Sequence, residues 1–178
     1  LLSKLGGQED VVIGVPASGR FHAALEHLIG MFINTLPLRV FPAAQTRLGD
    51  YLARVRETTL DAFANQDFHY EELVEKMGES GDSGKNQLFE TMFLFQNMVI
   101  PPVEVPGFVL EPVPLDNTSI EFDLLLECIE TGERMSCRFE YAASLFKPET
   151  IERFTGLLFN VIDSVIEAVT ADRSRTLS

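Results

Sequence analysis

Two adjacent polar side chains, Asn34 and Thr35, interrupt an apolar stretch and are the first candidates for chemistry in this sequence. The stretch runs from Ile29 to Val40. Its large and β-branched side chains favour a buried or half-buried strand over Met31–Val40. An amide inside such a strand must find hydrogen-bond partners or lose roughly 1–3 kcal/mol. Either Asn34 fixes a bulge or a neighbouring loop, or it faces a cavity through which a substrate carbonyl or amide passes.

Two further sets of polar residues lie at the ends of predicted strands. Ser18, Gly19 and Arg20 form a loop in which glycine and a lone arginine could contact an anion or a carrier, or could be a simple turn with a solvated arginine. Gln96 and Asn97 end a strongly apolar segment, where two amides either face a cavity or cap the strand end. For each group the structural and the functional interpretation both stay open.

The histidines and cysteines give no sign of a metal site or a disulfide framework. His22, His27 and His69 lack metal-ligand spacing, and each is interpreted as a surface or packing residue. Cys128 and Cys137 are too few for a disulfide scaffold or a four-ligand zinc site. We therefore predict no metal, and we expect both thiols to stay reduced in a cytoplasmic protein.

The charge and hydropathy of the chain exclude several classes of partner. A formal charge of −13 over 178 residues disfavours nucleic acid and anionic membranes, because no basic stripe offsets it. No apolar run approaches the roughly 20 residues that cross a bilayer, and no basic-then-apolar segment indicates a secretory signal. The first residues resemble the end of a helix, so we expect the chain to be part of a longer polypeptide.

Hydrophobic periodicity predicts strands that alternate with one-sided helices. The strands are predicted at Asp10–Pro16, Met31–Val40 and Leu88–Asn97, and the helices at His22–Gly30, Arg47–Asn65 and Lys147–Val169. Thr46 is the expected N-cap of the second helix, and Asp67 is expected to cap a short helix that follows it. The order predicts the α/β (α+β) class, with a mixed sheet covered by helices.

A β-hairpin is predicted over Phe122–Tyr141, with Gly132 and Glu133 as a two-residue turn. This turn places Cys128 opposite Cys137 and Leu126 opposite Phe139 on one apolar face, and Glu127 opposite Arg138 on a solvated face. Segment 78–85 is predicted to be an exposed, mobile loop without a complete phosphate-binding motif, and segment 100–114 a loop with an edge strand.

Ordered motifs across nearly the whole chain resemble those of the condensation domains of nonribosomal peptide synthetases. Segment Gly14–Arg20 runs into the stretch from Ile29 to Thr35, which is similar to the family's IGxFVNT signature. Gln66-Asp67 belongs to a segment similar to its QDxPFE motif. Segments 86–97, 122–124 and 140–146 resemble the NPLFxxMFxxQN, FDL and EY…LF motifs. The chain departs from the family pattern at His69 and Gln87, where proline is common.

The resemblance implies a lobe of a chloramphenicol-acetyltransferase-like fold. It covers only the C-terminal half of the family's domain, so residues 1–170 are expected to form the C-terminal lobe and 171–178 the start of a linker. The family's HHxxxDG catalytic motif lies in the N-terminal half, and no His-His pair occurs here. The resemblance therefore implies that this chain alone is inactive and holds no catalytic residue.

The chemistry that the resemblance implies is amide formation between substrates carried on phosphopantetheine, with no cofactor bound directly. The expected partners are the N-terminal lobe, donor and acceptor peptidyl carrier proteins, and an adenylation domain. Asn34, Thr35, Gln96 and Asn97 are candidates for the substrate tunnel. Ser18, Gly19 and Arg20 are candidates for a carrier or tunnel-mouth contact, and Gln66 and Asp67 form a structural motif.

Two alternatives to condensation come from other functional classes. The chain could be a non-catalytic module that docks carrier proteins, which the missing HHxxxDG motif would favour. A free-standing acyltransferase of the same fold ranks last, because none of the three histidines lies in a suitable motif.

Overall fold

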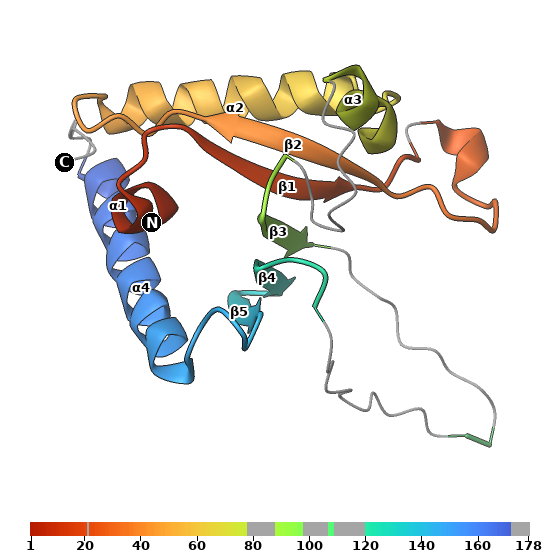
Figure 1. Ribbon diagram of the computed structural model, residues 1–178. Helices are drawn as coiled ribbons and strands as arrows, with labels where there is room; N and C mark the ends of the chain where they lie inside the picture. The colour runs from red at the N-terminus through yellow and green to blue at the C-terminus, as the bar shows by residue number, and fades with distance from the viewer. Residues whose placement is uncertain (21, 78–87, 98–106, 109–119, 172–178) are drawn as a thin grey trace.

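The computed structural model describes residues 1–20, 22–77, 88–97, 107–108 and 120–171 (Figure 1). Predictions for segments 78–85, 100–114 and 172–178 lie wholly or mainly outside these residues. The described elements, in chain order, are α1 (Leu2–Gly6), β1 (Val11–Ala17), the 3-10 turn η1 (Ala23–Leu25), β2 (Asn34–Val40), α2 (Leu48–Ala64), α3 (Tyr70–Lys76), β3 (Thr91–Gln96), β4 (Leu124–Thr131), β5 (Arg134–Tyr141) and α4 (Pro148–Thr170).

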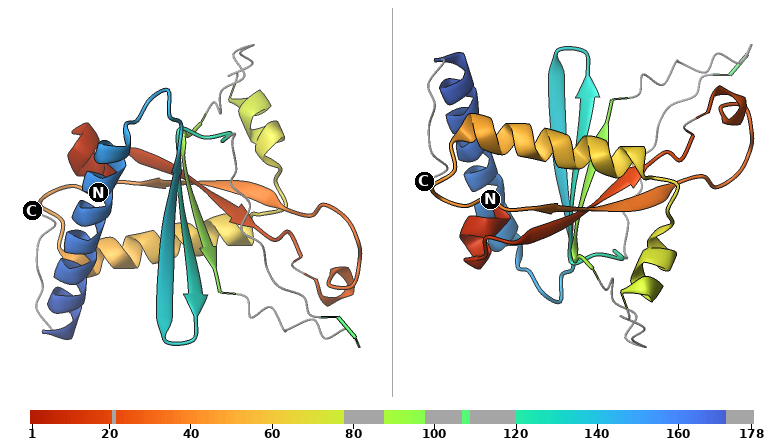
Figure 2. Two further views of the ribbon diagram at one scale, coloured as in Figure 1. Left: turned by 90° about the horizontal axis from the view of Figure 1, so that it is seen from below. Right: turned by 90° about the horizontal axis from the view of Figure 1, so that it is seen from above.

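The described strands form one mixed sheet in the order β2-β1-β3-β4-β5. The β1–β2 and β4–β5 pairs are antiparallel, whereas β3 runs parallel to both β1 and β4. Both views of Figure 2 show β4 and β5 crossing the direction of β1 and β2 at a steep angle, as the cumulative twist of a sheet produces. The predicted α/β class with a mixed sheet is confirmed.

The hairpin forms in the predicted register. Cys128 lies opposite Cys137, Leu126 opposite Phe139, and Thr131 pairs with Arg134 across the turn. Gly132 has φ 62°, which the first central residue of a two-residue hairpin turn requires. The apolar alternation and the turn residues therefore specified the same pairing, because a slip of one residue would reverse every side chain.

The strand predicted over Met31–Val40 begins three residues later, at Asn34, and this part of the prediction is wrong. Ile29, Met31 and Ile33 are 105%, 93% and 64% exposed. The physical reason is the length of the partner strand, because β1 ends at Ala17, which pairs with Asn34. The preceding helix prediction was also too long, since only the 3-10 turn η1 forms there.

The helices α2 and α3 form where periodicity predicts them, but their predicted caps are wrong. Arg47 occupies the N-cap position of α2 and His69 that of α3, and neither side chain makes a capping hydrogen bond. On α2 the predicted apolar stripe is partly exposed, with Leu48 buried but Leu52 41% exposed. The helix packs against the edge strand β2, so only a narrow part of its surface is covered.

Helix α4 begins at Pro148, as predicted, and its first turns build the core. Ile151 and Phe154 pack with Leu124 of β4, and Leu2, Phe139, Tyr141 and Phe146 surround this cluster. Farther along the predicted stripe, Val161 is 39% exposed, whereas Val165 is half-buried. None of the helices in the described part of the chain has the length and apolar character that a bilayer crossing requires.

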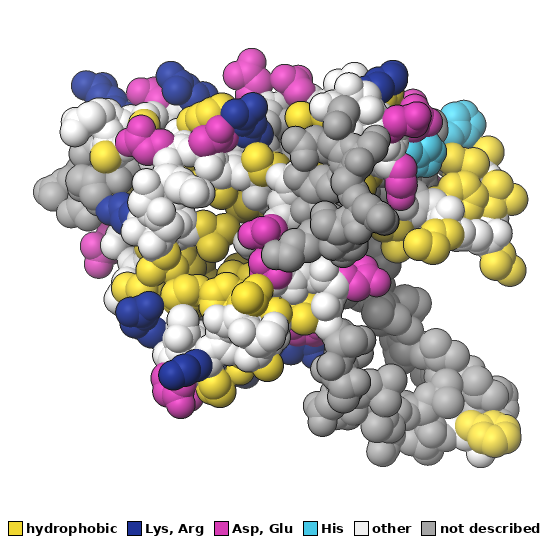
Figure 3. Space-filling model, viewed as in Figure 1, with side chains coloured by type: hydrophobic (Ala, Val, Ile, Leu, Met, Phe, Trp, Pro, Cys, Tyr) yellow, Lys and Arg dark blue, Asp and Glu magenta, His cyan; other side chains and the backbone are white. Residues whose placement is uncertain are grey.

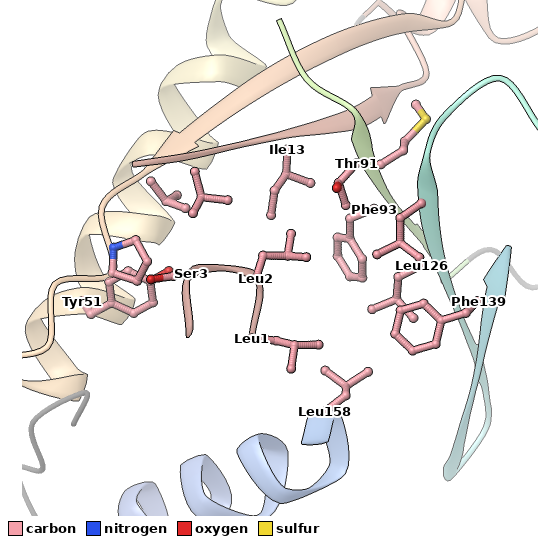
Figure 4. A pocket seen from close by; sticks show the side chains of 15 residues that line it. Leu1, Leu2, Ser3, Ile13, Tyr51, Thr91, Phe93, Leu126, Phe139 and Leu158 are labelled. Carbon is pink, nitrogen blue, oxygen red and sulfur yellow. The ribbon is translucent and has the colours of Figure 1, made fainter. Parts of the chain in front are cut away.

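An apolar cavity of about 200 Å³ lies between α4 and the sheet. Figure 4 shows side chains from α1, β1, β3, the hairpin and α4 pointing into it. The labelled apolar side chains include Leu2, Ile13, Phe93, Leu126, Phe139 and Leu158. The described helices and sheet therefore leave an apolar pocket between them.

Gly14 lies where β1 meets β3, and its lack of a side chain makes room for a buried ring. It pairs with Met92, and a Cβ at this position would overlap the ring of Phe89. Phe89 is 5% exposed, and its ring centroid lies 5.5 Å from that of Tyr70. A larger residue at position 14 would have to displace this aromatic packing.

We expect Gly14→Ala to lower the free energy of unfolding by about 1–3 kcal/mol, because the added methyl overpacks the ring of Phe89. The matched control is Gly156→Ala on the exposed surface of α4, where a Cβ meets nothing within 4 Å. This control should gain about 0.5–1 kcal/mol from helix propensity. Denaturant unfolding measures both, and equal effects of the two substitutions would contradict the packing argument.

Candidate functional site

Three of the candidate segments meet at one end of the sheet. Strands β1 and β3 are parallel, so both lead out at this end, into Ser18 and Asn97 respectively. Strand β2 is antiparallel to β1 and starts here, with Asn34 paired to Ala17. Strand topology therefore gathers polar residues that are up to 79 positions apart in the sequence, the separation of Ser18 from Asn97.

The candidate side chains at this end are divided between the two faces of the sheet. Successive residues of a strand point to opposite faces. Thr35 pairs with Pro16, and Gly14 pairs with Met92, so Thr35 and Gln96 share one face. Asn34 belongs to the other face. The four predicted tunnel residues therefore do not form a single cluster in the described chain, and Asn97 is exposed beyond the end of β3.

The amide of Asn34 connects the start of β2 to the start of α3. Its Nδ2 donates to the backbone carbonyls of Gln66 at 2.8 Å and Phe68 at 2.9 Å. Its Oδ1 accepts from the backbone N–H of Tyr70 at 3.2 Å and from that of Thr35 at 2.8 Å. Both donors and both acceptor positions of the amide are occupied. This side chain fixes a neighbouring loop, which is one of the two interpretations of the sequence.

The Gln66-Asp67 motif contributes through its backbone. The carbonyl of Gln66 accepts from Asn34, while Asp67 is exposed and does not cap α3. The N–H of Tyr70, at the first position of α3, is instead satisfied by the Asn34 side chain. A residue from a distant strand thus replaces a local cap.

The Tyr70 hydroxyl is buried and has no hydrogen-bond partner among the described residues.

Arg20 organises the loop between β1 and β2. Its guanidinium donates to the backbone carbonyls of Leu25, Leu28 at 2.8 Å and Gly30 at 3.3 Å. Its Cζ lies 4.3 Å from the centre of the Phe32 ring, a cation–π contact. The guanidinium is therefore engaged by carbonyls of its own loop, and its hydrogen bonds to Leu28 and Gly30 lie at the surface. It holds segment 22–32 in a folded loop, which explains why this apolar run is not part of β2.

The residues beside Arg20 have local roles. Gly19 has φ 62°, and a Cβ there would collide with the backbone carbonyl of Phe32, so both conformation and space require glycine. The hydroxyl of Ser18 accepts from the N–H of Arg20 at 3.4 Å. The loop that they shape carries exposed apolar side chains. Figure 3 shows apolar side chains gathered where this loop projects.

A buried carboxylate, Glu127, holds Gln96, and sequence reasoning missed it. Gln96 Nε2 donates to Glu127 Oε1 at 2.9 Å, and the Arg138 guanidinium lies 2.8 Å from the other oxygen. Arg138 also contacts Glu140 at 2.8 Å. Glu127 is only 7% exposed, so the predicted solvated face is wrong at this position. Its pairing with Arg138 was predictable from register, but its burial depended on the neighbouring strand β3.

No group of three or more His, Cys, Asp or Glu side chains that could hold a metal ion occurs among the residues that the structure describes. The polar groups at the end of the sheet are amides, a hydroxyl and an ion pair. Such groups can donate and accept hydrogen bonds and can orient a substrate. They do not form a nucleophile–base pair.

We expect Asn34→Ala to lower the free energy of unfolding by about 2–3 kcal/mol, because it removes three hydrogen bonds that tie β2 to segment 66–70 and a fourth to the backbone N–H of Thr35. Asn97→Ala, the same change at an exposed position, should stay within about 0.5 kcal/mol. Urea denaturation of the two variants gives the comparison. If both variants match the parent chain, the amide is not a structural tie.

We expect Arg20→Lys to open the loop over 22–32 while leaving global stability nearly unchanged, because lysine keeps the charge but cannot bond several carbonyls at once. Limited proteolysis within this segment should become about tenfold faster, which corresponds to a local loss of roughly 1.4 kcal/mol. Arg39→Lys, which changes an exposed ion pair with Asp10, is the control and should leave cleavage of the loop unchanged. Unaltered cleavage in Arg20→Lys would show that the guanidinium does not hold the loop.

Comparison with known proteins identifies the family. The model of the condensation domain family matches residues 1–177. Bacitracin synthase 3 of Bacillus licheniformis is 43% identical over 162 residues, and tyrocidine synthase 3 of Brevibacillus parabrevis is 40% identical over 169 residues. These matches cover 91% and 94% of this chain but only 2% and 3% of those relatives.

Solved structures show the same fold. A four-domain nonribosomal peptide synthetase bound to AMP and glycine matches with a TM-score of 0.83 at 20% identity, covering 99% of this chain and 14% of that chain. The first condensation domain of the CDA synthetase matches with a TM-score of 0.68 at 26% identity, and the chain spans 38% of its length. Together with the family match, these likenesses show that the chain belongs to the condensation domain family of nonribosomal peptide synthetases.

Proposed function

We propose that this chain is the C-terminal lobe of a condensation domain that joins a donor acyl or peptidyl thioester to an acceptor aminoacyl thioester. The observation that carries the proposal is the family match over residues 1–177. Coverage of 38% of the CDA condensation domain supports the view that a second part completes the domain. The family match also favours condensation over a non-catalytic docking module.

In the proposed reaction, the acceptor amine attacks the carbonyl carbon of the donor thioester. A C–N bond forms, the C–S bond breaks, and the amine proton is lost while the donor carrier's thiol is released. The HHxxxDG motif expected in the other lobe would supply the histidine, since this chain contains no His-His pair. Both substrates would ride on phosphopantetheine arms of carrier proteins, and correct orientation would supply much of the rate.

The contribution of this lobe would be to position the substrates. Gln96 donates its amide to Glu127, so its carbonyl oxygen is left to accept a hydrogen bond from an N–H group of a substrate or its arm. Thr35 shares the face of Gln96, and Asn97 follows directly in the chain. These three residues are the proposed tunnel contacts. Asn34 would act indirectly, by fixing the strand that bears Thr35.

The loop shaped by Ser18, Gly19 and Arg20 is the proposed tunnel-mouth segment. Arg20 has its guanidinium engaged with loop carbonyls, so the loop surface rather than this charge would meet a carrier protein or the other lobe. The exposed Ile29 and Met31 give that surface an apolar character. Within the synthetase, an adenylation domain is the further partner that we propose.

The test uses this chain, the complete domain that contains it, and the N-terminal part expressed separately. Carrier-bound donor and acceptor substrates are mixed with each preparation, and the condensed thioester is followed by mass spectrometry. The complete domain should form product, this chain alone should not, and addition of the N-terminal part should restore turnover. Turnover by this chain alone would contradict the proposal, and so would a complete domain that binds carriers but forms no product.

In the complete domain, Gln96→Leu should reduce kcat/KM at least about three- to tenfold, because it removes the proposed hydrogen bond to the substrate together with the hydrogen bond to the buried Glu127. Ser136→Ala on the exposed strand β5 is the control and should leave the kinetics unchanged. Thermal unfolding of each variant distinguishes lost contacts from lost folding. Unchanged kinetics for folded Gln96→Leu would remove this residue from the tunnel wall.

A further inference from the structure

Cys128 and Cys137 lie directly opposite each other on β4 and β5. Their Sγ atoms are 2.8 Å apart, and both cysteines are free. The two residues belong to neighbouring strands of one hairpin whose turn, at Gly132 and Glu133, fixes the register. The backbone pairing therefore places the two cysteine side chains next to each other on the same face of the hairpin.

The hairpin geometry suits a covalent bond at this position. A two-residue turn is closed by a hydrogen-bonded pair, here Thr131 with Arg134, and the pairs then alternate along an antiparallel ladder. Counting back from the turn makes Cys128–Cys137 a non-hydrogen-bonded pair. In such pairs the Cα atoms are about 4.5 Å apart, which lies within the range of about 4.4–6.8 Å that disulfides span.

The two thiols differ in their access to solvent. Cys137 is exposed on the outer strand β5, whereas Cys128 is 5% exposed. A reagent in solution can therefore reach Cys137 first, while Cys128 is protected from reagents but in contact with Cys137. This is the arrangement of an attacking thiol and a resolving thiol.

We propose that Cys128 and Cys137 form a reversible oxidation site, at which a small-molecule disulfide converts the two thiols into a cross-strand disulfide. The Cys137 thiolate attacks one sulfur of the reagent, forms a mixed disulfide and releases one reagent thiolate. The Cys128 thiol then loses its proton to solvent, and its sulfur attacks the Cys137 sulfur and releases the second reagent thiolate. The protein loses two hydrogen atoms, and one reagent disulfide becomes two thiols.

The environment of Cys128 sets the pH dependence of the second step. Burial and the nearby charge of Glu127 raise the pKa of the Cys128 thiol, and both causes remain after Cys137 has formed the mixed disulfide. The residue that pairs with Cys128 on the neighbouring strand β3 is Phe95, which does not titrate. Because thiolate is the attacking species, closure should accelerate about tenfold per pH unit between pH 7 and 9.

The experiment equilibrates the 178-residue chain with reduced and oxidised glutathione, quenches it with acid, and maps it with trypsin. Cleavage after Arg134 separates the two cysteines, so the disulfide appears as the peptide Met135–Arg138 linked to the peptide that contains Cys128. The same pair of peptides reports the bond in any longer polypeptide that contains the chain. Circular dichroism shows which samples are folded.

The expected result is an intrachain disulfide whose equilibrium constant is at least about tenfold larger in the folded chain than in urea, because the fold holds the sulfurs together. Cys128→Ser should stop at a glutathione adduct on Cys137, and folded Cys137→Ser should remain unmodified. A stable adduct on Cys137 of the parent chain, or an equal constant in urea, would overturn the proposal. Neither outcome bears on condensation, so the two proposals fail independently.

Discussion

The hydrogen bonds of the buried Asn34 amide hold together the end of the sheet at which the candidate residues meet. Strand β2 lies at the edge of the sheet, so it has a strand neighbour on one side only. The amide ties its first residue to two loop carbonyls and to the first N–H of α3. Because one side chain satisfies several backbone groups, the end of α2, the start of α3 and the start of β2 are fixed together. No apolar side chain could do this, since the groups to be satisfied are polar and partly buried.

The residues that carry the family resemblance act mostly on one another. Arg20 bonds the carbonyls of the loop that follows it, and Gly19 makes room for the Phe32 carbonyl of that loop. Gln66 contributes a backbone oxygen rather than its side chain. A sequence motif of the family can thus serve to fix the backbone rather than to contact a substrate. Thr35 and Gln96 share one face of the sheet, while Asn34 belongs to the other face.

Local patterns predicted the elements whose partners are near in sequence. The hairpin register followed from a glycine at the turn and from alternation on both strands, and the start of α4 followed from Pro148. Predictions failed where the partner was distant. Asp67 has the chemistry of a helix cap, but Asn34 reaches Tyr70 from 36 positions away and takes that role. The alternation along β4 predicts that Glu127 lies on a solvated face, but Gln96 and Arg138 cover this side chain.

By itself, the sequence determined the family, the mixed α/β class, the hairpin and the polar residue types available for chemistry, because turn residues, periodicity and motif order are local properties of a chain. Only the tertiary structure decided what those polar residues touch. The run before Asn34 has the composition of a strand, yet β1 ends at Ala17 and offers it no partner, while Arg20 folds it into a loop. Pairing and burial are set by the neighbours that the fold supplies, and these neighbours lie far away along the chain.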